Sequence, residues 1–167
     1  MTVAAVVILL LVTLQRLGEL VLARANTARL LARGAHEVGA GHYPLIVGLH
    51  AAWLGGLWLL ALGRPVVWGW IGLFLVLQLL RVWVIATLGR RWTTRIIVLP
   101  GETLVARGPF RLIPHPNYAV VAAELAVLPL AFGLGWYALL FTLLNAIVLA
   151  IRIRAEDGAL RGAAALR

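Results

Sequence analysis

The amino-acid sequence predicts an all-α integral membrane protein, a polytopic bundle of about five transmembrane helices forming one domain over residues 1–167. Three observations carry this prediction. The mean hydropathy is +0.99. Only 13% of the residues are charged, whereas about a quarter are charged in soluble domains. Five apolar stretches each approach the roughly 20 residues that cross a hydrocarbon core, which leaves no length for a second domain.

The five apolar stretches are separated by segments that carry Gly, Pro and Arg. They cover residues 2–23, 44–62, 66–88, 118–133 and 135–151. No basic residue precedes the first stretch, so we expect it to remain as a helix rather than to be cleaved as a signal peptide. Gly133, Leu134 and Gly135 alone join the last two stretches, which predicts a tight helical hairpin. Pro129 is expected to kink the fourth.

The distribution of positive charge predicts the topology. The net charge is +9 and all 15 basic residues are arginines, a usage that indicates a GC-rich bacterial genome. They lie between the apolar stretches rather than in one patch, so nucleic acid is not an expected partner. Arginines cluster after the first, third and fifth stretches. The positive-inside rule therefore places these ends in the cytoplasm and the N-terminus outside the plasma membrane.

The absence of cysteine excludes disulfides and cysteine nucleophiles.

The connection from Gly89 to Asn117 is longer than a turn between helices needs, which indicates a function for it. Within this connection, Ile96–Leu99 and Thr103–Ala106 flank Pro100, Gly101 and Glu102. This pattern predicts a short β-hairpin-like excursion at the membrane surface.

Several polar side chains fall inside the apolar stretches, where each needs a partner or a water-filled cavity. They are Gln15, Arg16, Glu19, His50, Gln78, Arg81, Glu124 and Asn145. One interpretation makes them functional; the other is that they pair between helices or extend to the interface. Arg16 and Glu19, three residues apart, are able to pair with each other.

The last helix carries a polar stripe. Asn145, Leu149, Arg152 and Glu156 recur at helical spacing and lead from the membrane to the cytoplasm. Such an arginine and carboxylate are able to receive a zwitterionic ligand, the guanidinium holding a carboxylate and Glu156 holding a cation. The alternative is a surface ion pair at a helix end.

The segment from Gly108 to Tyr118 is the densest candidate site. Three prolines rigidify the backbone around His115, and Tyr118 is placed to face both headgroups and a pocket. Asn117 and Glu124, seven residues apart, share a helix face, which predicts that the polar surface continues inward.

These motifs, taken in order, resemble the isoprenylcysteine carboxyl methyltransferase family of membrane enzymes. The resemblance covers roughly residues 90 to 160. It rests on Leu104 to Arg111, on His115-Pro116-Asn117-Tyr118, on the helical hairpin, and on Arg152 to Asp157 followed by Leu160. His42-Tyr43-Pro44 and Gly89 to Ile97 further resemble a bacterial branch linked to O-methylation of alkylpyrone-type polyketides. Pro114 departs from the family, which has Arg before the His, and the usual Tyr-containing tail is missing; Arg111 and Arg154 are the candidate substitutes.

The resemblance implies S-adenosyl-L-methionine bound at the cytoplasmic side. The cofactor-binding residues that match the family positions are His115, Tyr118 and Glu156, and we add Asn117, Arg111, Arg154, Leu104 and Val105 as further candidates for cofactor binding. We expect contacts to the acceptor from a second set, namely Glu37, His42, Tyr43, Arg95 and Arg152. The alternative for the first loop is a solvated polar segment held by interface anchors. His36 and His42 lack the spacing of a zinc motif, so no metal is assigned.

The function expected from these observations is S-adenosylmethionine-dependent methyl transfer to an oxygen (enol, hydroxyl or carboxylate) of a lipophilic small molecule. Methyl transfer mainly requires aligned reactants and excluded solvent, so few catalytic groups are needed and none is named. The alternatives are a prenylcysteine carboxyl methyltransferase, a nicotinamide-dependent membrane reductase, and a transporter or helical scaffold. The sequence has no glycine-rich dinucleotide fingerprint, which counts against the reductase.

Overall fold

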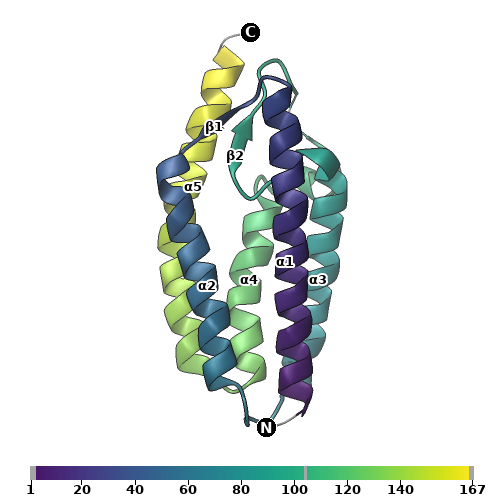
Figure 1. Ribbon diagram of the computed structural model, residues 1–167, viewed down its shortest axis with the longest axis vertical. Helices are drawn as coiled ribbons and strands as arrows, with labels where there is room; N and C mark the ends of the chain where they lie inside the picture. Colours follow the sequence, from purple (N-terminus) through teal and green to yellow (C-terminus); the bar gives the residue numbers. More distant parts are fainter. Residues whose placement is uncertain (1–2, 104, 166–167) are drawn as a thin grey trace.

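Five helices run along the long axis of the molecule in the computed structural model, with the two ends of the chain at opposite ends of that axis (Figure 1). The structure describes residues 3–103 and 105–165, with side chains described up to residue 159. The helices are α1 (Val3–Ala32), α2 (Tyr43–Leu60), α3 (Trp68–Leu88), α4 (Pro116–Ala131) and α5 (Gly135–Ala165). The predicted all-α class and the five helices are confirmed.

Four of these helices, all except α4, are long and apolar enough to cross a membrane, so the chain is an integral membrane protein. α4 has 16 residues, about 24 Å of helix. It packs against α3 on one side and α5 on the other. Leu125, Leu128 and Ala131 of α4 have no exposed surface. α4 is therefore the central helix, and its neighbours cover its short span.

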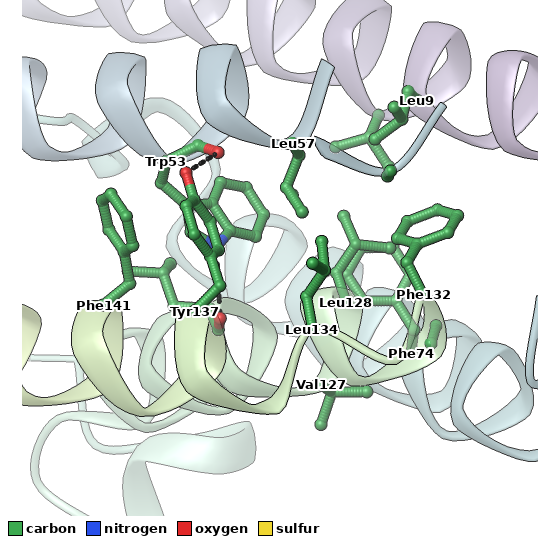
Figure 2. Packing of buried hydrophobic residues seen from close by; sticks show 14 of the residues in the cluster. Leu9, Trp53, Leu57, Phe74, Val127, Leu128, Phe132, Leu134, Tyr137 and Phe141 are labelled. Atoms are coloured by element: carbon green, nitrogen blue, oxygen red, sulfur yellow. Dashed lines mark hydrogen bonds between the residues drawn. The ribbon is translucent and has the colours of Figure 1, made fainter. Parts of the chain in front are cut away.

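Aromatic residues join α2 to the α4–α5 hairpin (Figure 2). The indole Nε1 of Trp53 donates a hydrogen bond to the Leu125 carbonyl of α4 at 3.1 Å. The hydroxyl of Tyr137 on α5 lies 2.9 Å from the Trp53 carbonyl. This approach requires glycine at position 56, because a Cβ there would lie 2.1 Å from the Tyr137 oxygen.

A two-stranded antiparallel sheet lies at the end of the molecule where α5 finishes (Figure 1). Its strands are β1 (His36–Val38) and β2 (Ile96–Val98), with Glu37 opposite Ile97. β2 falls where the hairpin was predicted, but its partner comes from the first loop rather than from Thr103–Ala106, so the predicted pairing is wrong. The long connection is thereby attached to the α1–α2 loop. Short 3₁₀ helices complete these loops at Ala40–His42 (η1), Gly89–Arg91 (η2) and Gly108–Arg111 (η3).

Candidate functional site

The start of α4 and the C-terminal part of α5 meet through two pairs of side chains. His115 is the residue before α4, and its Nε2 lies 3.2 Å from Oδ1 of Asp157 on α5. One turn further on, the Tyr118 hydroxyl donates a short hydrogen bond to Glu156. The His115 and Tyr118 rings stack with centroids 5.3 Å apart. Pro116 is the first residue of α4 and follows His115 directly. Its fixed φ angle sets the start of the helix, and thereby the backbone that carries the His115 and Tyr118 rings.

Arg152 of α5 lies against Tyr118 and is buried, with 7% of its surface exposed. Its Nε donates to the Tyr118 oxygen at 2.7 Å, and its Nη2 donates to the Thr94 carbonyl at 2.8 Å. Both acceptors are uncharged, and in the described part of the chain Arg152 makes no ion pair with a carboxylate. A buried guanidinium without an anion is costly, so this position favours an anionic ligand.

The loop between α1 and α2, together with the start of α2, lies next to the segment that contacts Arg152. The Tyr43 hydroxyl lies 3.1 Å from Oγ1 of Thr94, and the guanidinium of Arg95 lies 4.5 Å from the Tyr43 ring centroid. Nη1 of Arg95 contacts Glu37 on β1 at 2.7 Å. This hydrogen bond raises the pKa of Arg95 above its ordinary value, so its positive charge is kept. Glu37, Tyr43 and Arg95 thus form one group, attached to Arg152 through Thr94.

Two buried oxygens near these groups accept no hydrogen bond from the described residues. They are Oδ1 of Asn117 on α4 and Oε1 of Glu37 on β1. A buried acceptor without a donor costs roughly 1–3 kcal/mol. Donors from a ligand or from water would remove that cost.

Other predicted site residues lie apart from this group. Arg111 and Arg154 are exposed, and neither forms a hydrogen bond or ion pair with His115 or Glu156 in the described structure. His42 in η1 packs its ring against Gly39. Val105 lines a separate hollow of about 450 Å³ with Arg91 and Arg107. Leu104 lies outside the described residues.

An apolar groove of about 320 Å³ lies between α3 and the η3–α4 segment. Trp83, Leu112, Ile113 and Pro116 are among its lining residues. Since Ile113 and Pro116 flank His115 in the chain, the groove begins beside the polar site and offers a surface to an apolar chain.

Sequence reasoning left Asp157 and Thr94 out of the site. Asp157 follows Glu156 directly, so the paired carboxylates were a signal for it. Thr94 contributes its backbone carbonyl to Arg152, a role that its residue type does not reveal.

Comparison with known proteins places this geometry in context. The model of the family described as "Isoprenylcysteine carboxyl methyltransferase (ICMT) family" matches residues 70–162, more than half of the chain. The matched range includes His115, Tyr118, Arg152 and Glu156 but not the first loop. A protein of Bacillus subtilis (strain 168), "Uncharacterized protein YpbQ", is 40% identical over 153 residues, which cover 88% of this chain and 90% of the relative. No solved structure matches the chain.

Proposed function

The chain belongs to the isoprenylcysteine carboxyl methyltransferase family, and on this premise we propose that it transfers a methyl group to an oxygen of a lipophilic small molecule. Family membership implies a membrane methyltransferase that uses S-adenosylmethionine. The acceptor oxygen that we propose is an enol, a hydroxyl or a carboxylate. The observation that carries this proposal is the buried Arg152, which has no carboxylate partner in the described structure and lies against Tyr118.

The charges at the junction of α4 and α5 suit S-adenosylmethionine, which carries a carboxylate, an ammonium and a sulfonium. Glu156 and Asp157 are partly exposed, with 29% and 42% of their side-chain surface accessible, so their carboxylates are available to a cation. The unpartnered Asn117 oxygen is a further acceptor. We propose that His115, Asn117, Tyr118 and Glu156 hold the cofactor. Arg111, Arg154, Leu104 and Val105 remain predictions from the family resemblance.

Arg152 is proposed to receive the anionic oxygen of the acceptor. Two of its N–H groups are committed to Tyr118 and Thr94, which fixes the plane of the guanidinium and leaves other N–H groups for a ligand. Glu37 and His42 from the loop between α1 and α2, Tyr43 at the start of α2, and Arg95 from the connection between α3 and α4 are proposed to border the acceptor head group. The first three lie outside the family match, so acceptor choice is expected to depend on them.

Bound S-adenosylmethionine supplies an electrophilic methyl group to an oxygen nucleophile. For a carboxylate or an acidic enol, whose oxygen is already anionic near neutrality, the residues of this chain need only bind the reactants, orient them and exclude water. The apolar groove beside His115 is proposed to hold the lipophilic part of the acceptor.

Thermal unfolding of the detergent-solubilised protein with S-adenosylhomocysteine and with NADPH tests the proposal. A ligand that binds only the folded state raises the midpoint. We expect S-adenosylhomocysteine to raise it, and His115→Ala and Glu156→Gln to abolish the rise. The matched controls are His36→Ala, whose side chain is exposed on β1, and Glu102→Gln in the long connection. Stabilisation by NADPH alone would favour a reductase and contradict the proposal.

An acceptor screen then separates the two methyltransferase alternatives. Incubation with an alkylated enolic lactone and with a prenylated cysteine analogue, each with labelled cofactor, identifies the methylated class. We expect the enolic acceptor to be preferred; exclusive labelling of the prenylated cysteine carboxylate would assign the alternative activity.

A further inference from the structure

Six polar side chains from three helices form one hydrogen-bonded cluster between the apolar parts of those helices, which we call the ionic tie. Its members are Gln15, Arg16 and Glu19 on α1, Gln78 and Arg81 on α3, and Glu124 on α4. The ionic tie contains two arginines and two glutamates, so its charges balance. Arg81 is 6% exposed and Glu124 is fully buried. Its position is therefore inside the helix bundle rather than at a lipid-facing surface.

Every carboxylate oxygen in the ionic tie accepts a hydrogen bond. The guanidinium of Arg81 donates to both carboxylate oxygens of Glu19, with Nη2 2.6 Å from Oε2. Nη1 of Arg16 donates to the same Oε2 at 3.1 Å. Glu124 accepts from Gln78 at 2.8 Å through one oxygen and from Arg16 and Arg81 through the other, at 2.8 and 3.0 Å. Each of the four carboxylate oxygens accepts from a donor on another helix. The ionic tie therefore fixes the helices relative to each other.

Helix contacts in lipid need such a device, because lipid is as apolar as the helix surfaces and gives little preference for one register over another. Charge pairs and polar residues specify register in buried helix contacts. In the ionic tie, a slide of α4 by one turn would separate Glu124 from Arg16 and Arg81 and leave charges unpaired in hydrocarbon.

The helix fixed in this way is the one that begins the candidate site. Tyr118 precedes Glu124 by six residues, about 9 Å along α4. We propose that the ionic tie sets the height of α4 against α1 and α3, and thereby holds His115 and Tyr118 level with Arg152 and Glu156. Its members are positioning residues. The catalytic consequence rests on the proposed function, whereas the position of α4 does not.

The chain has no cysteine, so single labelling sites can be added without removing native ones. Ala28→Cys, exposed on α1, and Ala126→Cys, half-buried on α4 and outside the apolar groove, are positions for two spin labels. In lipid nanodiscs we expect a narrow distribution of label distances by pulsed electron resonance. Glu124→Gln should shift or broaden this distribution, whereas Glu102→Gln, the same chemical change outside the ionic tie, should leave it unchanged.

A second variant keeps the test decisive if Glu124→Gln fails to fold. Arg16→Gln combined with Glu124→Gln retains one arginine and one glutamate, so the charge balance is kept while the α1–α4 ion pair is lost. We expect this double variant to fold and still to shift the label distances. Native distances in the folded variants would overturn the proposal.

The affinity for S-adenosylhomocysteine, measured in the same samples, tests whether the position of α4 affects the candidate site. We expect at least tenfold weaker binding wherever α4 moves. If α4 moves and binding keeps its native strength, the positioning role is overturned. If the parent protein binds no S-adenosylhomocysteine while the label distances respond as expected, the proposed function fails and the ionic tie's control of α4 stands.

Discussion

The guanidinium of Arg152 lies 5.5 Å from the ring centroid of Tyr118, and its Nε donates a hydrogen bond to the phenol oxygen. The same phenol donates to Glu156. Tyr118 therefore separates a buried cation from a carboxylate four residues along the same helix, two groups that would otherwise attract each other directly. This arrangement leaves each charge available to a ligand group of the opposite sign.

Tyr118→Phe removes the bridge between Arg152 and Glu156. Without the hydroxyl we expect the two side chains to pair with each other, so that Glu156 is no longer available to the cofactor and Arg152 is no longer available to the acceptor. Calorimetric titration should show S-adenosylhomocysteine affinity falling roughly tenfold, about 1.4 kcal/mol. Tyr137→Phe is the matched control, because among the described residues its hydroxyl donates to α2 carbonyls in the core and to no residue of the candidate site. Equal losses in the two variants would contradict a role specific to the site.

Arg152→Lys tests the acceptor side. A lysine ammonium is a compact charge that lacks the planar fork, so it is unable to hold both Tyr118 and Thr94 while presenting further donors. We expect kcat/KM for the acceptor to fall about 10- to 100-fold, roughly 1.4–2.8 kcal/mol, with a smaller change in S-adenosylhomocysteine affinity. The exposed Arg29→Lys on α1 should change neither quantity. A selective loss of cofactor affinity would instead assign Arg152 to the cofactor.

Gly56→Ala tests the packing of α2 on α5. The added Cβ would lie 2.1 Å from the Tyr137 oxygen, so the phenol must move and lose its hydrogen bonds. Overpacking of this kind costs about 1–3 kcal/mol, which thermal unfolding in detergent should detect. Gly55→Ala, one residue earlier, meets no atom within 4 Å, and we expect it to unfold at or above the parent temperature because alanine favours helix.

The orientation proposed from the arginine distribution, with the N-terminus outside and the site in the cytoplasm, is open to direct labelling. Pro65→Cys lies between α2 and α3, and Ala32→Cys lies at the end of α1. A membrane-impermeant maleimide applied to intact cells should label the cysteine at position 65 and reach that at position 32 only after lysis. The reverse pattern would place the candidate site outside and contradict a cytoplasmic cofactor.

Hydropathy predicted the five helices well. In lipid, a single segment forms all of its backbone hydrogen bonds internally only when it is a helix. Helical spacing also placed Arg152 and Glu156 on one face, and both contact Tyr118. The pairing of β1 with β2 was not predictable, since their register joins segments about 60 residues apart and the Pro-Gly turn after β2 indicated a local partner instead.

The polar residues within the spans were recognised from the sequence, but their partners were not. Glu124 was expected to extend a polar face from Asn117; in the structure it pairs with Arg16 and Arg81 of other helices. Spacing within one helix reports which residues share a face, whereas the choice of partner depends on how helices pack in three dimensions.

Whether α4 and α5 together form the site of a membrane methyltransferase is measured most directly by transfer of label from methyl-tritiated S-adenosylmethionine into organic-extractable product. Membranes containing the protein should yield labelled lipophilic product, and membranes containing His115→Ala or Glu156→Gln should yield at most about a hundredth of it, while His36→Ala and Glu102→Gln match the parent. Equal labelling with and without intact His115 and Glu156 would contradict a methyltransferase site at the junction of α4 and α5.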